Sequence, residues 1–179
     1  MTKRKIPTAL EKGEKAVRCN TSSPSPFLVK NAKLLAPIGP NMVCVDIGCG
    51  NGRNSIWAAK QGYVTLGIDR HGGQTPGNYL IIRGDIRDEI PINDNAVDLV
   101  LVDFVLMFLT HAERLDLLEQ VDRLTARGGF VVIELYAAKE SYSPTLQAVA
   151  DLASDILTYM PGSYEAVKAI KNSIILRKL

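Results

Sequence analysis

The chain has 179 residues, and its 21 lysines and arginines nearly balance its 19 aspartates and glutamates, for a formal net charge of +2. A chain of this length forms one domain that buries roughly 70% of its unfolded surface, so neither disulfides nor a metal is needed to hold the core. The interspersed charges argue against a large polyanion-binding face, and the longest apolar run, 99–109, is interrupted by Asp103 and too short to span a membrane.

The first residues and the cysteines bear on where the protein works. The first ten residues carry charge but no apolar stretch of signal-peptide length, so we expect a cytoplasmic protein that does not associate with a membrane. Cys19, Cys44 and Cys49 are odd in number and lack Cys or His partners at zinc spacing. We therefore expect reduced thiols and no metal site.

The N-terminal part differs in composition from the rest of the chain. Prolines and the TSSPSP stretch at 21–26 indicate a turn-rich break, followed by a short helix from Phe27 to Leu35. We expect residues 1–40 to be a lead-in segment and residues 41–179 to form the main domain.

Short apolar, β-branched runs then alternate with helical or loop segments. Such runs are typical of a parallel sheet that is covered on both faces. A helix is expected at 54–61, a second after the capping-box residues Thr110 and Glu113, and a third from Ser143 to Met160. The expected strands are 42–47, 64–69, 79–84, 97–103 and 129–136, with a final antiparallel hairpin of 164–170 and 173–179 at the sheet edge. The pattern predicts an α/β fold: a doubly wound, mostly parallel sheet with helices on both faces and a C-terminal antiparallel hairpin.

The strongest local signal is VCVDIGCGNGRN, in which a strand leads into a glycine loop and then into a helix. Gly48, Gly50 and Gly52 permit a tight turn and a close approach of a nucleotide-like ligand to the backbone. The spacing differs from the dinucleotide pattern, because Arg53 stands where the third glycine would be. Asp46 suits a cationic amino-acid group or its water network better than a pyrophosphate. A neutral or cationic nucleoside is thus favoured over NAD.

Two further aspartates follow the next two strands. Asp69 ends the second strand, where a carboxylate can accept hydrogen bonds from a ribose diol. Asp85 ends the third, where it can accept from an adenine amine while Ile86 packs on the ring. Each aspartate alone is also a common turn residue, but acids after three successive strands favour a ligand site.

DIGCGNGRN, GIDR, RGDIRD, IPINDNAVDLVLVD and GGFVVIELY resemble the successive motifs of class I S-adenosylmethionine-dependent methyltransferases, over about residues 42–136. DIGCGNGRNSIWAAKQGY and the VLMFL segment at 105–109 further resemble the tellurite-resistance-type enzymes, which act on small substrates. The resemblance implies S-adenosylmethionine as the cofactor and methyl transfer to a small-molecule acceptor.

The resemblance also implies a set of cofactor-binding residues: Asp46, Gly48, Cys49, Gly50, Gly52, Arg53, Asp69, Arg70, Asp85, Ile86, Asp103 and Phe104. In this pattern Asp46 and the loop glycines surround the methionine end, Asp69 the ribose, and Asp85 with Ile86 the adenine. Asp103 and Phe104 face the transferable methyl group. For Arg53, a place near the cofactor carboxylate and a structural ion pair remain equally open.

Methyl transfer from a sulfonium is an in-line displacement in which positioning supplies most of the acceleration, and it requires no metal. If the acceptor must lose a proton, Asp103 is the first candidate base, followed by His111 and Tyr136. Each has a structural alternative: Asp103 as a strand-end cap, His111 as an exposed first-turn residue, and Tyr136 as a packing residue.

Some features depart from the family pattern. The Gly- and Pro-rich stretch between Asp69 and Tyr79 predicts a loop where a helix is usual, and with GDIRDE it is similar to the heat-shock ribose 2′-O-methyltransferases of RNA. Of that family's Lys-Asp-Lys-Glu tetrad only Asp103 is in register, because Ile133 and Glu134 replace the lysine of the fifth strand. RNA is therefore the second hypothesis for the acceptor, and a non-catalytic cofactor-binding partner subunit is the third. The short turn at 171–172 leaves the substrate pocket open or completed by a partner chain, and the oligomeric state stays undetermined.

Overall fold

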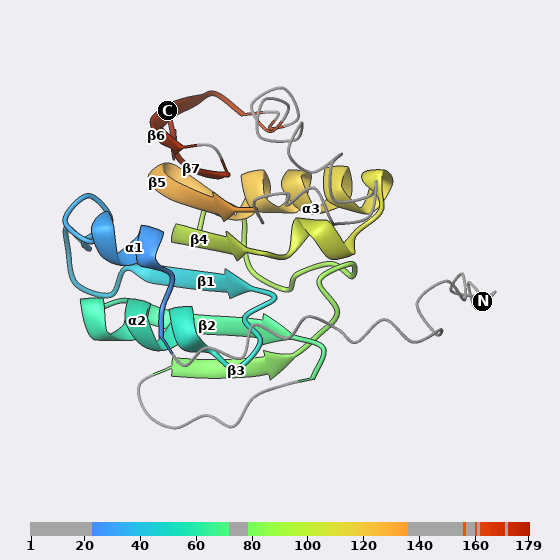
Figure 1. Cartoon of the computed structure of the whole chain (residues 1–179), viewed down its shortest axis with the longest axis horizontal. Coiled ribbons are helices and arrows are strands. Elements are labelled where there is room, and N and C mark those ends of the chain that lie inside the picture. The colour runs from blue at the N-terminus through green and yellow to red at the C-terminus, as the bar shows by residue number, and fades with distance from the viewer. Residues whose placement is uncertain (1–22, 72–78, 136–155, 157–159, 161, 171) are drawn as a thin grey trace.

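The five apolar runs that precede the C-terminal hairpin form the parallel part of one seven-stranded sheet (Figure 1). The computed structural model describes residues 23–71, 79–135, 156, 160, 162–170 and 172–179. The strand order is β3-β2-β1-β4-β5-β7-β6, and β7 is antiparallel to both of its neighbours. The strands are β1 Val43–Ile47, β2 Val64–Asp69, β3 Tyr79–Arg83, β4 Val97–Asp103, β5 Thr125–Glu134, β6 Tyr164–Ile170 and β7 Ser173–Lys178. The predicted doubly wound fold with its terminal hairpin is confirmed.

One strand begins earlier than predicted. β5 begins at Thr125, directly after a helix, and not at residue 129, because Thr125 already pairs with Val97 of β4. The register then shifts between Val97 and Leu99, and Gly129 lies so close to β4 that an added Cβ would meet the Val97 and Asp98 carbonyl oxygens at 3.1 Å. The Ala126 carbonyl oxygen of β5 would lie closer still, at 2.8 Å, so only a glycine fits there without a shift of the backbone.

The helices agree with the prediction at their starts better than at their ends. The capping box at Thr110 is confirmed, since its side chain accepts from the Glu113 N–H and the Glu113 side chain accepts from the Thr110 N–H. The first helix is shorter than expected and ends at Lys30, where Asn31 caps it with both backbone and side-chain N–H groups. The expected helix from Ser143 to Met160 lies mostly outside the described residues. The helices are α1 Pro26–Lys30, α2 Arg53–Gln61, the 3-10 turn η2 Leu106–Phe108, and α3 His111–Leu124.

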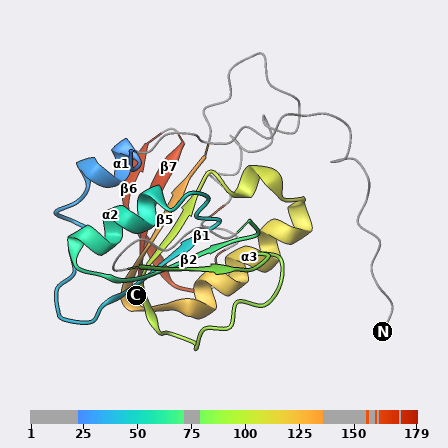
Figure 2. The same cartoon turned by 90° about the horizontal axis from the view of Figure 1, so that it is seen from below.

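Helices cover both faces of the sheet (Figure 2). On one face α1 and α2 pack Phe27 and Trp57 against sheet residues such as Leu101. On the other face α3 packs Leu117 against residues such as Val100. No helix in the described part of the chain has the length and apolar character needed to cross a membrane.

The topology places the polar strand ends together. β1 pairs with β2 on one side and β4 on the other, so the strand order reverses between β1 and β4. In open α/β sheets, ligands bind outside the carboxyl ends of the strands at such a reversal. The candidate site is therefore the edge formed by the carboxyl ends of β1 to β5.

Candidate functional site

The glycine loop between β1 and α2 is held close to the neighbouring strands. Gly48 has a φ of +67°, and its N–H donates to the Ile68 carbonyl at 2.8 Å. A Cβ at this position would lie 2.6 Å from Cγ2 of Val105, so a larger residue is excluded by both conformation and space. Gly52 caps α2 at a φ of +77° and leaves the first N–H groups of the helix at the loop. The loop thus combines close backbone approach with helix N–H donors, as predicted.

Asp69 ends β2 directly beside this loop. Its Oδ2 accepts from the Gly50 N–H at 3.0 Å, and its Oδ1 accepts from the His71 N–H at 2.9 Å. Each carboxylate oxygen has a second acceptor position, so these bonds orient the side chain and leave it able to accept from a ligand. Arg70 follows on the surface, and its carbonyl accepts from Nε of Arg83 at 3.0 Å.

Asp85 follows β3 and forms an ion pair with Arg87. The hydrogen bonds from the Arg87 side chain lower the pKa of Asp85, so this carboxylate is ionised and paired with the guanidinium of Arg87. Ile86 is partly buried and packs against the main core. Sequence reasoning did not anticipate the Arg87 pairing, although the spacing of two residues permits it.

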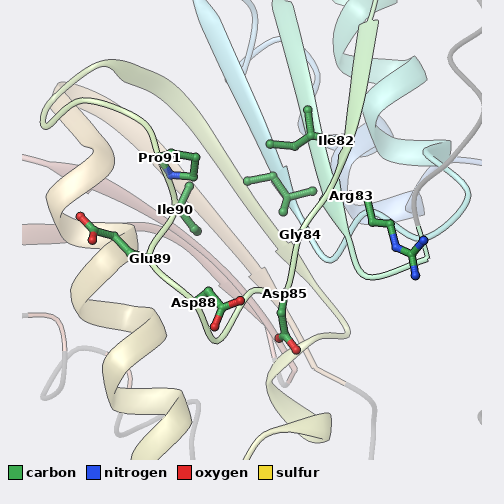
Figure 3. Close-up of a pocket in the computed structure, with 9 residues that line it drawn as sticks. Ile82, Arg83, Gly84, Asp85, Asp88, Glu89, Ile90 and Pro91 are labelled. Atoms are coloured by element: carbon green, nitrogen blue, oxygen red, sulfur yellow. The ribbon is translucent and has the colours of Figure 1, made fainter. Parts of the chain in front are cut away.

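A small cavity of about 180 Å³ adjoins Asp85 (Figure 3). It lies between the carboxyl end of β3 and the segment from Asp88 to Pro91, and it combines apolar and acidic side chains. The lining residues are Ile68, Ile82, Arg83, Gly84, Asp85, Asp88, Glu89, Ile90 and Pro91.

Asp46 is buried beneath the loop, with 2% of its surface exposed. Its Oδ2 accepts from the Ser55 hydroxyl at 2.6 Å. Burial raises the pKa of Asp46 to about 7 despite this hydrogen bond, and the nearby Asp103 charge adds to the effect. Cys49 in the loop is also buried, and the pKa of its thiol is raised, mainly by burial. The thiol is therefore neutral, and it contributes shape to the loop rather than charge.

Arg53 and Asp103 form a buried ion pair between α2 and β4. Arg53 is the first residue of α2, and its Nη2 donates to Oδ2 of Asp103, which also accepts from Nδ2 of Asn54 at 2.6 Å. Of the two roles left open for Arg53, the structure shows the ion pair. Burial raises the pKa of Asp103 although Arg53 opposes the shift. Both groups use one oxygen of Asp103.

The second oxygen of Asp103, Oδ1, is buried and has no hydrogen-bond partner among the residues that the structure describes. The side chain as a whole is 7% exposed. Because a buried acceptor without a partner costs about 1 to 3 kcal/mol, such an atom calls for a specific explanation. A proton or a ligand donor at this position would provide one.

Glu134 is a site residue that sequence reasoning did not select. It ends β5 as the register partner of Asp103 and is 5% exposed. Its carboxyl oxygens accept from the hydroxyls of Ser25 and, at 3.5 Å, Ser173. Burial, and then the Asp103 charge, raise the pKa of Glu134 to about 7. The signal that could have identified Glu134 is that an acid ends each of the two neighbouring parallel strands, β4 and β5. The sequence prediction extended the fifth strand to Tyr136, so it did not place Glu134 opposite Asp103.

The segment before α1 contacts Arg53, Asn54 and Glu134, which together with Asp103 form a cluster of polar side chains. The Ser25 N–H donates to Oδ1 of Asn54 at 2.9 Å, and the Ser23 carbonyl accepts from Nη1 of Arg53 at 3.2 Å. Ser25 also caps α1 by accepting from the Phe27 N–H. This segment closes the cluster on the side of α2.

The remaining predicted residues lie around the cluster or outside the described chain. Phe104 has a φ of +57°, donates its N–H to the Glu134 carbonyl at 2.9 Å, and has the Arg53 guanidinium 5.9 Å from its ring centre. His111 is exposed at the first residue of α3, whereas Asp103 is buried. Tyr136 lies outside the described residues. Within the described ranges, no group of three or more His, Cys, Asp or Glu side chains has the arrangement of a metal site.

Residues 45–133 match the family model described as a methyltransferase domain. This stretch runs from within β1 to the residue before the end of β5, so it contains the glycine loop and the acids that end or follow the first four strands but not Glu134. No curated protein matches the chain.

Several solved structures share the fold. A protein of Anabaena variabilis, described as a methyltransferase from an antibiotic biosynthesis pathway, is 16% identical with a TM-score of 0.63, over 83% of this chain and 66% of that one. A TehB-like SAM-dependent methyltransferase from Corynebacterium glutamicum is 22% identical with a TM-score of 0.60, over 84% and 86%. Phosphoethanolamine N-methyltransferase 2 of Haemonchus contortus, in complex with S-adenosyl-L-methionine, is 17% identical with a TM-score of 0.59, over 83% and 40%. At these identities the likeness concerns the fold.

Proposed function

We propose that this chain, which carries a class I S-adenosylmethionine-dependent methyltransferase domain, transfers the methyl group to a small-molecule acceptor. S-adenosylmethionine is its cofactor. The identity of the acceptor is the part of the function that we infer from the site. We also propose that residues 1–40 are a lead-in segment to this domain.

The observation that carries the proposal is the charge of the site. Asp46, Asp103 and Glu134 are buried at the ends of three strands, and the only base that contacts them in the described chain is Arg53. Buried carboxyls in excess favour a cationic ligand and oppose a phosphate next to the loop. This agrees with a sulfonium cofactor and disfavours a dinucleotide.

The residues at the edge fit the parts of this cofactor in turn. Asp69 would accept from the ribose hydroxyls, and the cavity lined in part by Asp85, next in sequence to Ile86, would hold the adenine ring. Asp46 and the glycine loop would surround the methionine end. S-adenosylmethionine supplies a methyl group on a positively charged sulfur, which an acceptor attacks in line.

Asp103 is the residue that we place nearest to the acceptor. Arg53 and Asn54 bind its Oδ2 and fix the side chain, and this leaves Oδ1 as the oxygen that can accept a hydrogen bond or a proton from the acceptor. Phe104 follows at a positive φ, and its ring lies beside the guanidinium of Arg53. Positioning of this kind lowers the barrier of a displacement without covalent participation of the protein.

Two features support a small acceptor over RNA. The residue beside Asp103 on β5 is Glu134, a carboxyl group, where the RNA ribose enzymes that the sequence resembles have a lysine. In addition, Arg53, Arg83 and Arg87 at this edge are engaged by carboxylates or a carbonyl of the chain. The Haemonchus structures that share the fold include one with phosphomonomethylethanolamine, which is a small acceptor.

Calorimetry and an acceptor screen test the proposal. S-adenosylmethionine is expected to bind and NAD is not; binding of NAD alone would overturn the cofactor assignment for this site. Formation of S-adenosylhomocysteine is then measured with amines, phenols, thiols and carboxylic acids, and with structured RNA. Turnover with a small acceptor supports the proposal. Turnover with RNA alone, with affinity that falls steeply with salt, contradicts it.

A further inference from the structure

Asp46, Asp103 and Glu134, which we call the buried acid cluster, carry an inference about how the site distinguishes its cofactor from its product. The inference rests on the proposed function, since it places the sulfonium of the cofactor at the carboxyl ends of β1 and β4. We propose that the buried acid cluster selects the positively charged cofactor over the uncharged thioether product, and that Glu134 gives up a proton when the cation binds.

The charged groups that face the cluster come from four elements. β1 contributes Asp46, β4 contributes Asp103, β5 contributes Glu134, and α2 contributes Arg53. Asp69, at the end of β2, is half-buried beside the loop. The other contacts of the cluster, from the α1 segment and β7, are hydroxyl groups. Within the described residues, three buried carboxyls therefore have one guanidinium near them, which is bonded to Asp103.

Full ionisation of the cluster would leave a net charge of −2 in a buried site. Burial of unbalanced charge is expensive, so such groups keep protons until a counter-charge arrives. In agreement, the pKa values of Asp46 and Glu134 are raised to about 7, mainly by burial. Independently of charge, Oδ1 of Asp103 lies in a side chain that is 7% exposed and has no partner in the described part of the chain, so the cluster can accept a further donor or positive charge.

Glu134 is the member best placed to release the proton. Asp103 is already paired with Arg53, and Asp46 lies beneath the loop that would contact the cofactor. The hydrogen-bond partners of the Glu134 carboxyl group are hydroxyls, which donate to its oxygens without balancing its charge. Its register neighbour is Asp103, whose charge disfavours a second ionised carboxyl.

The proton step balances without a further reactant. When the cation binds, the O–H bond of the carboxyl group breaks, the proton passes to the solvent, and the negative charge left on the cluster balances the sulfonium. Methyl transfer removes the positive charge from sulfur, and the carboxylate then takes up a proton from the solvent. The two ligands, cofactor and product, differ at sulfur only by the methyl group and its charge, so their comparison isolates this effect.

The expected signature is a difference in pH dependence. For one carboxyl group with a pKa of about 7 that ionises on binding, affinity for the cation rises about 15-fold from pH 5.5 to pH 7.0. Affinity for S-adenosylhomocysteine is expected to change much less over this range. Calorimetry in buffers of different ionisation enthalpy should show proton release with S-adenosylmethionine and little with S-adenosylhomocysteine.

Glu134→Gln tests the assigned residue, because glutamine keeps the size and the acceptor for Ser25 but cannot titrate. The variant is expected to lose the rise in S-adenosylmethionine affinity of about 15-fold between pH 5.5 and pH 7.0, while its affinity for S-adenosylhomocysteine stays within about twofold of the wild type. Glu119→Gln, the same change on an exposed residue of α3, is the matched control and should retain the wild-type profile.

The outcomes separate the two proposals. If neither compound binds, the proposed function fails. If both bind with parallel pH profiles and equal proton release, the selection by charge is refuted while the proposed function stands. If the variant does not fold, the wild-type comparison of the two compounds still decides the proposal. A wild-type difference that persists unchanged in Glu134→Gln refutes the assignment to Glu134.

Discussion

Replacement of Glu134 by glutamine is expected to make the ligand-free protein more stable at alkaline pH and to leave it little changed at acidic pH. Burial raises the pKa of Glu134 in the folded protein from its ordinary 4.5 to about 7. As the pH rises, the unfolded chain therefore ionises at this residue before the folded protein does. The stability that the protonated group contributes is fully present below about pH 4.5 and is lost as the pH rises through about 7.

The size of the effect follows from the same pKa values. At about 1.4 kcal/mol for each unit of pKa difference, the wild type should lose about 2 kcal/mol of unfolding free energy through Glu134 between pH 5 and pH 8. Asp46, raised to about 7, adds a loss of the same sign. Both proteins share the Asp46 contribution, so the difference between wild type and Glu134→Gln isolates Glu134.

Urea unfolding at pH 5, 6, 7 and 8, followed by circular dichroism, measures this difference. The two stability curves are expected to differ by about 1 kcal/mol at pH 5 and by about 3 kcal/mol at pH 8, in favour of the variant at both. Glu119→Gln should follow the wild type throughout. Parallel curves for wild type and Glu134→Gln would show that the carboxyl group is ionised in the folded protein and would refute the burial argument.

Three further substitutions, Gly48→Ala, Asp69→Ala and Thr110→Ala, test other parts of the site and its scaffold, and two of them have a matched comparison variant. Gly48→Ala combines a positive φ with a 2.6 Å approach to Val105 and should lower unfolding free energy by about 2 to 4 kcal/mol, whereas Gly50→Ala, with open space around it, should cost only about 1 kcal/mol. Equal losses in urea unfolding would contradict the close approach to Val105 as the cause. Asp69→Ala should weaken S-adenosylmethionine binding by about 1 to 3 kcal/mol in calorimetry, and an unchanged affinity would remove this residue from the site. Thr110→Ala should lower unfolding free energy by about 1 kcal/mol through the lost helix cap, and Thr110→Ser should restore most of it; an equally destabilised serine variant would count against the capping bond.

Local patterns in the sequence predicted the framework well. The strands at 64–69 and 97–103 have the predicted bounds, and the capping box at Thr110 and the terminal hairpin are also confirmed. These features depend on residues that are close in the chain: apolar runs, glycines at the loop, and a cap three residues from its partner. The acids at the strand ends were likewise identifiable, because parallel strands bring their carboxyl ends to one edge.

The partners of those acids were decided only by the tertiary structure. Arg53 was recognised as a candidate, but its pairing with Asp103 depends on how the packing of α2 on β1 and β2 brings its first residue to the end of β4. The pairing of Asp103 with Glu134 depends on the register shift at the start of β5, and Ser25 reaches Glu134 from a segment more than a hundred residues earlier. Side-chain pKa values depend on burial and on such neighbours rather than on residue type. The sequence by itself therefore determined where the acids lie along the sheet edge, while packing determined which of them are buried, paired and able to hold a proton.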